Sequence, residues 1–597
     1  MIRSCGAVLL LALAFAASGW EQNGSNRFSG AARVVVFGDV HGAFEEMQRI
    51  LRKVAVIDAS DRWIAGDTHL VSIGDLLGRG DESRAAMDLL MRLQREAEAA
   101  GGRVHVVLGN HEVMNLTGDL AYVTKGEFAS YIDVAPDPAD SEHPPGFAGH
   151  RQALSAEGPY GRWLLGLPFA VVINDVLYLH AGVGKVIAGL SLEQLNERAH
   201  AELRQLMAAR ETLRAGGAIT RGNDNGDVYE IATRLSEDAA TPEELRTAAG
   251  AFLKAIDGLP FDPRGPAWNR RNATCHPFYN QAVVAQALGD LGAERLVIGH
   301  TPTSGRTIQS RFDGQVVLID TGMNVAHYKG RPSALEFVGD VERVHYTDLD
   351  LTTVQPQTQR TWNRPYGMSD AEIERFLAEA EVVQIEDLPI GVTKPQRLTL
   401  RQGDREMRAV FKTYDSNPDV APGRWSRKLE DSDRYLYDLA AYRLDRLLGF
   451  EMVPPAVIRE VNGRSGLAQY WLEGAINDKD RRDQSIPYRG VCGQADQYNL
   501  MNVFDALIYN VDRNLSNVLY TRSDWRVWLI DHTRAFRASA RIPRYLRESP
   551  WAFTPEIVAM LERINLELLA PLEDIISDRQ LRGIERRAKA LLKLAEG

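Results

Sequence analysis

The stretch that decides the fold is Arg33–Gly42, which reads RVVVFGDVHG. Four apolar residues in a row predict a short buried strand, and the glycine after them predicts a turn. The turn carries Asp39 and His41, two side chains that bind metals or move protons. A buried strand that ends in a polar turn is typical of an α/β sheet, so this segment indicates both a fold class and the place of a site.

The same arrangement recurs along the chain, alternating with helical patterns as far as about residue 340. The further strand-like runs are His69–Ile73, Val104–Leu108, Val176–Leu179, Arg295–Ile298 and Val316–Ile319. The turns after the first four read GDLLGRG (74–80), GNHE (109–112), HAG (180–182) and GHT (299–301). Five such turns are expected to place their polar side chains on one edge of one sheet, where ligands bind. Their carboxylate, amide and imidazole groups suit Mn, Fe or Zn.

The order of these motifs resembles that of the calcineurin-like metallophosphoesterases. The exact residues of the motifs, including GPAWNR at 265–270, look most like those of the phosphoprotein-phosphatase branch and its bacterial Shewanella-like subgroup. The resemblance covers roughly residues 33–340, and the expected domain spans residues 30–349. It implies an α/β fold, a metallophosphoesterase β-sandwich flanked by helices, with two divalent metal ions.

The resemblance also implies a role for each motif residue. Metal ligands are expected at Asp39, His41, Asp75, Asn110, His180 and His300, with Asp75 between the two ions. His111 matches the general acid, and Arg79 and Arg270 match the phosphate clamps. A hydroxide between the ions would attack phosphorus in line, and the ions and arginines would stabilise the developing charge. The expected activity is hydrolysis of a phosphate ester in a phosphorylated protein or a small phosphomonoester.

One position departs from the branch, which has Asp where this chain has Gly78. In the family that Asp orients the acid histidine, and an imidazole without such a partner loses its tautomer preference and basicity. We therefore expect metal binding to survive and turnover to be reduced. Asp81 is the candidate substitute, and Glu112 is expected to support the ligands rather than to react.

Two insertions interrupt the strand pattern. Residues 136–149 are rich in Pro, Asp and Gly and predict a loop, and residues 190–256 predict a helical cap. The cap either shapes the substrate site or serves packing alone. The polar stretch at 350–370 predicts a linker.

The C-terminal unit, residues 371–597, carries a second ordered set. Lys412 ends a predicted strand, and Asp438 lies in a predicted helix, Tyr435–Leu448. DRNLSN follows at 512–517, and DHT follows at 531–533 after the run WRVWLI. Phosphoryl transfer needs a lysine on the nucleotide phosphates, a base and two oxygen ligands for Mg²⁺. The phosphate-binding lysine could be Lys412, paired with Asp438. The base could be Asp512, and the magnesium ligands could be Asn517 and Asp531.

This second set resembles the atypical kinases, near the phosphatidylinositol-kinase and HipA-type groups and the secretory-pathway protein kinases. The resemblance implies a bilobal α+β domain that binds Mg and ATP. The departures are Asp438 in place of Glu, DHT in place of DFG, and no GxGxxG, for which Gly391–Lys394 is the nearest candidate. The unit is therefore either a kinase or a degenerate binding domain.

The N-terminus has a short basic start and an apolar run at Ala7–Ala17, which predicts a signal peptide over residues 1–18 and export to the periplasm or outside the cell. No later run is long enough to span a bilayer, so no stable membrane insertion is expected after cleavage. A periplasm holds little ATP, which argues against a working kinase there.

The chain has 69 basic and 80 acidic residues and a net charge of −11, which makes general nucleic-acid binding unlikely. Its 45% hydrophobic and 25% charged residues are ordinary globular values. Cys5 lies in the leader, and Cys275 and Cys492 make no disulfide framework. Two unpaired thiols are the expectation, with a single bridge as the alternative.

Three alternatives to a phosphomonoesterase stay open at this stage. The same metal cage would serve a nucleotide or dinucleoside-polyphosphate hydrolase. The two units together would make a bifunctional kinase–phosphatase. The departures at Gly78 and in the kinase-like motifs would also fit a catalytically weak phosphate-binding regulatory protein.

Overall fold

The computed structural model describes residues 26–138, 142–357, 364–389, 394–416 and 433–596. The predicted signal peptide lies outside the described residues, as do parts of the predicted linker and of Gly391–Lys394. Within the described ranges, no helix has the length and apolar character needed to cross a membrane.

Two sheets form the N-terminal unit, which gives it the predicted sandwich. The five-stranded sheet has the order β11 (Val341–Tyr346), β10 (Ser333–Val338), β2 (Arg33–Phe37), β3 (His69–Ser72) and β4 (Arg103–Val106). The seven-stranded sheet has the order β1 (Arg27–Phe28), β5 (Ala170–Ile173), β6 (Val176–Leu179), β7 (Arg295–Ile298), β9 (Val316–Leu318), β8 (Gln309–Arg311) and β12 (Gln355–Pro356). The predicted strands are confirmed, with ends that differ by one or two residues.

The strand β2 shows how the sandwich is built. Its alternate residues Val34 and Val36 join a core that draws on both sheets, while Val35 and Phe37 face the helix-covered side. Side chains of a strand point to opposite faces in turn, so one apolar run can serve two cores. The expectation that all five turns share one sheet is wrong, because β6 and β7 belong to the other sheet.

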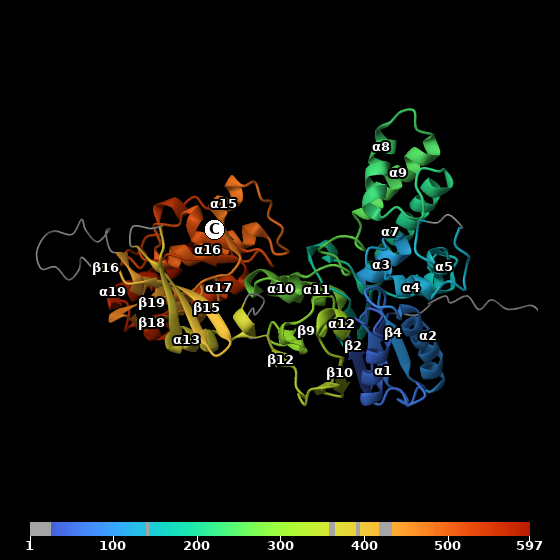
Figure 1. The fold of residues 1–597 in the computed structure, drawn as a ribbon, viewed down its shortest axis with the longest axis horizontal. Coiled ribbons are helices and arrows are strands. Elements are labelled where there is room, and N and C mark those ends of the chain that lie inside the picture. The colour runs from blue at the N-terminus through green and yellow to red at the C-terminus, as the bar shows by residue number, and fades with distance from the viewer. Residues whose placement is uncertain (1–25, 139–141, 358–363, 390–393, 417–432, 597) are drawn as a thin grey trace, which may run out of the picture.

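Helices cover the outer faces and form the cap. They are α1 (Phe44–Lys53), α2 (Ser83–Ala99), α3 (Asn110–Thr117), α4 (Lys125–Ala129), α5 (Phe147–Ala153), α6 (Pro159–Leu164), α7 (Leu192–Ala215), α8 (Asn225–Glu237), α9 (Glu243–Ile256), α10 (Arg271–Thr274), α11 (Pro277–Leu291) and α12 (Val325–Tyr328). The predicted helical cap corresponds to α7, α8 and α9, which share a small core and project from the unit (Figure 1). The predicted loop at 136–149 ends earlier than expected, because α5 begins at Phe147.

The C-terminal unit has the predicted bilobal α+β arrangement with two cores, and the helix Tyr435–Leu448 packs into the core of the second lobe. The first lobe is an antiparallel sheet of β13 (Glu381–Asp387), β14 (Gln396–Gln402), β15 (Arg405–Lys412), β19 (Arg464–Tyr470) and β18 (Ala456–Val461), with α13 (Asp370–Glu379) and α14 (Tyr435–Leu448). The second lobe holds α15 (Asp478–Asp483), α16 (Gln494–Ile508), α17 (Pro555–Glu562), α18 (Leu566–Leu569) and α19 (Asp578–Ala595), with β20 (Ala475–Asn477), β21 (Val518–Thr521) and β22 (Val527–Leu529). A two-stranded ribbon joins β16 (Asp415–Ser416) to β17 (Asp433–Arg434).

The two units meet at α10 and α11, which lie between them in Figure 1. A disulfide joins Cys275 to Cys492, with a Cα–Cα distance of 5.4 Å, so the expectation of two unpaired thiols is wrong. The His276 ring lies 3.0 Å from the Gly449 carbonyl oxygen, and Phe278 packs on Phe450. This junction begins directly after Arg270, the predicted phosphate clamp.

Candidate metal centre

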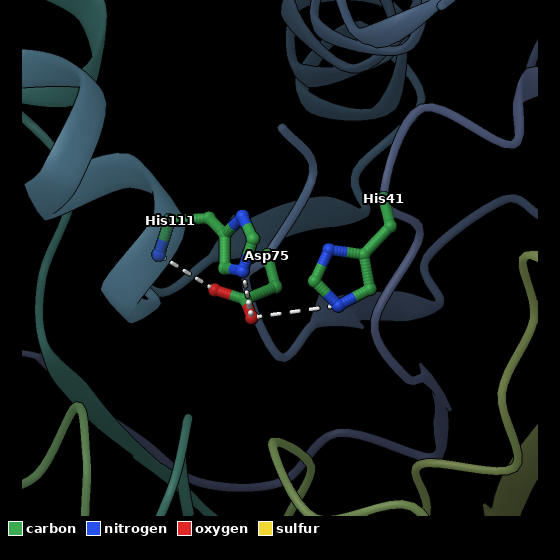
Figure 2. A group of neighbouring side chains, drawn as sticks. All are labelled: His41, Asp75 and His111. Atoms are coloured by element: carbon green, nitrogen blue, oxygen red, sulfur yellow. Dashed lines mark hydrogen bonds and ion pairs between the residues drawn. The ribbon is translucent and has the colours of Figure 1, made fainter. Parts of the chain in front are cut away.

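The five polar turns converge at one end of the sandwich, around Asp75. One carboxylate oxygen of Asp75 lies 3.3 Å from His180 Nε2. The other lies 3.7 Å from His41 Nε2 and 3.9 Å from His111 Nε2 (Figure 2). Asp39 completes this side of the cluster, 3.9 Å from His41 Nε2. Asp75, the predicted bridging carboxylate, thus lies between two groups of side chains and contacts both.

The second group of side chains surrounds His180. Its Nε2 lies 3.0 Å from Asn110 Oδ1 and 3.1 Å from His300 Nδ1, in addition to Asp75. Its Nδ1 lies 2.9 Å from the Ile73 carbonyl oxygen, which can only accept, so Nδ1 carries a proton. In the neutral ring, Nε2 is then a lone pair that faces the Asn110 amide oxygen and an Asp75 carboxylate oxygen.

Acceptor atoms that face one another repel unless a cation lies between them. Two ligands bound at about 2.1 Å and at right angles lie about 3.0 Å apart, close to the distances around His180. Two groups of three residues in the described chain place their ligand atoms within 4.8 Å of one another: His41, Asp75 and His111, and Asp75, His180 and His300. The residues present therefore fit two divalent ions, and the ligand roles of the six predicted residues stay predictions.

The electrostatics of the cluster agree with this fit. Burial lowers the pKa of His41 to about 3 and that of His111 to about 4. Burial acts the same way on His180, but the carboxylates of Asp75 and Asp39 outweigh it and raise its pKa to about 9. A proton on His180 would occupy the position that the distances assign to an ion.

The backbone is strained at the same places. His41, Asp75 and His300 have φ angles of 49°, 52° and 63°, in the left-handed region that residues other than glycine rarely adopt. Such conformations cost on the order of 1–3 kcal/mol each and cluster at functional sites. The turns hold these side chains inward at a cost to stability.

Glu112 supports Asp75 from behind, as the sequence predicted. Its carboxylate accepts hydrogen bonds from the backbone N–H groups of Asp75 and Leu76, each at 2.8 Å. It also accepts from the Gly109 N–H, which caps α3. The same carboxylate therefore fixes the start of α3 and the turn that carries Asp75.

The geometry at Gly78 explains how His111 is held without the carboxylate of the family. A Cβ atom at Gly78 would lie 2.6 Å from His111 Nδ1, so the ring occupies the space of a side chain. The Leu77 carbonyl lies close enough to the His111 ring to offset part of the effect of burial on the pKa of His111. Asp81 does not substitute, because its carboxylate accepts from Thr124 Oγ and lies on the surface.

The two predicted phosphate clamps flank the cluster. Arg79 lies over the Tyr122 ring, 4.4 Å from its centroid, and Tyr122 stacks on His111. Arg270 donates to the His300 carbonyl oxygen at 2.7 Å. Neither arginine forms an ion pair with a carboxylate in the part of the chain that the structure describes, so both charges remain available to an anion.

Sequence reasoning missed the segment after β9. Asp320 is buried, and its charge contributes with burial to a pKa of Asp39 well above the usual range. The Tyr328 hydroxyl lies 3.1 Å from His41 Nε2, and Asn324 donates to the His41 carbonyl. Asp320 follows the predicted strand Val316–Ile319, so the rule that located the other five turns could have found it.

The C-terminal unit also gathers its predicted residues. Lys412 Nζ lies 2.8 Å from Asp438 Oδ2 and 3.0 Å from Asp531 Oδ1. Asp438 is fully buried and accepts the backbone N–H of His532 at 2.6 Å. Despite the burial of Asp438, Lys412 and His532 lower its pKa below the usual range. Strand β15, helix α14 and the turn after β22 thus meet at one charged cluster.

Asp512 and Asn517 lie beside this cluster. Asn517 Nδ2 donates to the Asp512 carbonyl oxygen at 3.2 Å, and the Ile530 N–H donates to the Asn517 carbonyl. The Asp512 carboxylate is 3.4 Å from an Arg534 nitrogen. Both residues are thus near Asp531, while their roles as base and magnesium ligand stay predictions.

Comparisons with known proteins support a phosphoesterase site at the cluster around Asp75. The family model for calcineurin-like phosphoesterases matches residues 32–218. Shewanella-like protein phosphatase 2 of Arabidopsis thaliana is 27% identical over 344 residues, covering 53% of this chain and 77% of that protein. An uncharacterized protein of Schizosaccharomyces pombe is 30% identical over 308 residues, covering 51% of this chain and 76% of its own length.

Solved structures also resemble the C-terminal part of the chain, and the Fam20 protein of hydra is one of them. The Fam20 protein of hydra covers 38% of this chain and 89% of its own length, with 17% identity and a TM-score of 0.29.

Proposed function

Because the chain belongs to the calcineurin-like phosphoesterase family, we propose that its N-terminal unit is a two-metal phosphatase of the Shewanella-like type. The proposed reaction is hydrolysis of a phosphate monoester. The observation that carries the proposal is the group of possible ligand atoms around His180 Nε2 and Asp75, which two divalent ions would satisfy. The family adds that the cations serve phosphate-ester chemistry.

Divalent ions such as Mn²⁺, Fe²⁺ or Zn²⁺, when bound, supply an activated water and Lewis-acid stabilisation of the transferred phosphoryl group. Asp39, His41 and Asp75 would hold one ion, and Asp75, Asn110, His180 and His300 the other. The Tyr328 hydroxyl contacts the His41 ring nitrogen that faces the cluster, and Asn324 holds the His41 backbone carbonyl. Glu112 fixes the turn of Asp75 through backbone hydrogen bonds.

The remaining side chains act on the substrate. Arg79 and Arg270 would bind the phosphate oxygens, since neither has a carboxylate partner among the described residues. His111 would protonate the leaving oxygen. Burial favours its neutral form, with the pKa lowered to about 4, and a phosphate dianion beside the ring would favour the protonated form.

A phosphorylated protein is the substrate we favour. The Arabidopsis relative is named a protein phosphatase, which supports this choice. Hydrolysis of diadenosine tetraphosphate in preference to phosphopeptides would instead favour the dinucleoside-polyphosphate alternative.

The test is hydrolysis of para-nitrophenyl phosphate by chelator-treated protein, with and without added Mn²⁺. The expected result is turnover that depends on Mn²⁺ and falls by at least about a thousandfold in Asp75→Asn. Asp81→Asn is the matched control, since this exposed carboxylate lies outside the cluster and should leave the rate unchanged. Equal turnover in Asp75→Asn and wild type would contradict the proposal.

A second candidate function concerns the C-terminal unit, which we propose binds a nucleotide together with Mg²⁺. The specific observation is that Lys412 is held between a buried carboxylate, Asp438, and a partly exposed one, Asp531. The lysine would bind phosphate oxygens, and Asp531 with Asn517 would hold the ion. Asp512 would be the base if phosphate is transferred.

Nucleotide binding and transfer can be separated by experiment. Binding of ATP is measured in the presence of Mg²⁺, and radiolabel transfer from ATP is measured in parallel. Loss of binding in Asp531→Asn would support the site, and loss of transfer alone in Asp512→Ala would support a kinase. No ATP binding by the wild type would contradict this second function.

We also propose that the protein is exported. The Cys275–Cys492 bridge supports this, since disulfides persist in oxidising compartments and are rare in the cytosol. Recovery of the mature chain from the periplasm or the medium, beginning after about residue 18, would test it.

A further inference from the structure

A cavity of about 540 Å³ lies between the cap helix α7 and the C-terminal end of α3. We call it the cap cavity. The charged residues in its wall are Arg151, Arg204, Arg210, Arg214 and Arg221, with Glu157 and Glu211. Its volume is typical of ligand pockets, and its arginines outnumber its carboxylates in a chain with a net charge of −11.

Two of these arginines converge on one point at the end of α3. A Cβ atom at Gly118 would lie 3.0 Å from Arg210 Nη2 and 3.3 Å from Arg151 Nη2. Each guanidinium is fixed by a neutral partner: Arg151 donates to the Asn115 carbonyl at 2.6 Å, and Arg210 to Asn225 Oδ1 at 2.9 Å. The two groups are therefore held together, although like charges repel.

The charges of this pair are incompletely compensated. Neither Arg151 nor Arg210 forms an ion pair with a carboxylate within the described ranges of the chain. Asp119, Asp224 and Asp227 lie near Arg210 and act on it only at longer range. Burial lowers the pKa of both arginines to about 10, and for Arg151 the charges of Arg210 and Arg221 add to this effect. An anion in the cavity would relieve the repulsion.

We infer that the cap cavity binds a second anionic group of the substrate, a phosphate or a carboxylate, while the first phosphate reacts at the metal centre. This inference rests on the proposed phosphatase function. The helix α3 links the two places, because His111 lies in its first turn and Gly118 caps its end. The cavity thus gives the cap a role in choosing the substrate.

The helix also sets the spacing of the two anions. It has 8 residues, and at about 1.5 Å per residue its ends lie about 12 Å apart. All 8 residues of α3 are buried, so a bound peptide has to pass around the helix. An extended peptide advances about 3.3 Å per residue, so the second anion is expected at least four residues from the reacting phosphoresidue. The preferred substrate class is therefore a phosphopeptide that carries a second acidic group at that distance.

The test compares synthetic peptides with one phosphoserine, to which a second phosphoserine or a glutamate is added two to six residues away. A second phosphoserine at four or more residues should lower KM roughly tenfold relative to closer spacings, and glutamate should lower it less. Para-nitrophenyl phosphate is the reference, because it carries no second anion.

The variants are Arg151→Gln and the double variant Arg204→Gln with Arg221→Gln. Both should abolish the peptide preference and leave para-nitrophenyl phosphate hydrolysis unchanged. If Arg151→Gln does not fold, the double variant still decides, because Arg204 and Arg221 are exposed. Arg198→Gln on the same helix is the control, since this exposed arginine lies outside the cavity and should keep the preference.

Three results would overturn the inference. The first is equal KM at every spacing while para-nitrophenyl phosphate is hydrolysed. The second is a preference that survives the arginine substitutions. The third is stimulation of para-nitrophenyl phosphate hydrolysis by free phosphoserine through the same arginines, which would identify a free effector. No hydrolysis of para-nitrophenyl phosphate by the wild type would instead overturn the phosphatase proposal, and the inference with it.

Discussion

The cluster around Asp75 and the cluster around Lys412 differ in how their charges are balanced. Around Asp75, the neutral His180 ring presents the lone pair of Nε2 to the Asn110 amide oxygen at 3.0 Å and to an Asp75 carboxylate oxygen at 3.3 Å. Around Lys412, an ammonium group already lies between two carboxylates. The first arrangement needs a cation, either a proton on His180 or a metal ion, whereas the second already contains its ammonium group.

This difference determines how strongly the geometry supports the phosphatase proposal and the nucleotide-binding proposal. A cluster that needs an ion argues for a metal, because folding would otherwise bring repelling atoms together. A balanced cluster is equally compatible with an ion pair that only stabilises the fold. The phosphatase proposal therefore rests on stronger structural support than the nucleotide proposal.

The largest expected effect concerns His111. His111→Asn should lower kcat for a phosphoserine peptide by roughly 10²–10⁴-fold, because the serine alkoxide leaves poorly without a proton. The loss should be smaller for para-nitrophenyl phosphate, whose nitrophenolate leaves without one. Steady-state kinetics on both substrates measure the ratio, and Asp512→Asn in the other unit should change neither. Equal losses on the two substrates would argue against a general acid.

The next effect concerns the balance of the Lys412 cluster. Asp438→Asn should destabilise the C-terminal unit by about 3–5 kcal/mol, because it leaves a buried ammonium with one carboxylate fewer. Thermal unfolding measures this, and para-nitrophenyl phosphate hydrolysis should be retained at temperatures where the protein stays folded. Asp531→Asn should cost less, since that side chain is 41% exposed. Unchanged stability in Asp438→Asn would mean that the cluster is not balanced by this pair.

A smaller effect is expected at Gly78. Gly78→Asp should lower kcat about tenfold with metal content unchanged, because the new Cβ atom displaces the His111 ring. Gly101→Asp is the matched control, with a similar φ of 86° and no heavy atom within 4 Å of the added Cβ. A higher kcat in Gly78→Asp would show instead that the missing family carboxylate limits turnover.

The smallest effect concerns Glu127, which accepts the Gly78 N–H at 3.2 Å. Burial raises its pKa to about 8, so between about pH 5 and 8 the folded state keeps a proton that the unfolded state releases. Stability therefore falls as pH rises through this window. Glu127→Gln removes this effect, and its Tm relative to wild type should be roughly 2–4 °C higher at pH 8 than at pH 5. The exposed Glu98→Gln should show no such change.

The local patterns of the sequence predicted most of the fold. Short apolar runs followed by Gly and Asp or His gave the strands, and Ala, Glu and Leu periodicity gave α7, α8 and α9. The division of the strands between two sheets could not be read in this way, because strand pairing is set by contacts between distant segments. The boundaries proposed for the two domains stay predictions.

The sequence predicted those parts of the candidate site that are formed by reactive side chains, but not those formed by backbone atoms. The turns at Asp39, Asp75 and His180 were identified from their residues and come together as expected. The Leu77 carbonyl that contacts the His41 ring could not be predicted, since a backbone oxygen has no sequence signature. The Cys275–Cys492 bridge spans 217 residues and depends on how the two units dock. The arginines of the cap cavity lie in three separate segments and were not recognised as a group.

The central claim is that the Asp75 cluster binds two metal ions, whereas the charges of the Lys412 cluster are balanced without a metal ion. The most direct test is the number of Mn²⁺ ions bound per chain, measured by elemental analysis after chelator treatment and reloading without nucleotide. The account predicts two ions in the wild type, two in Asp438→Asn and fewer than one in Asp75→Asn. No bound ion in the wild type, or two ions retained in Asp75→Asn, would contradict it.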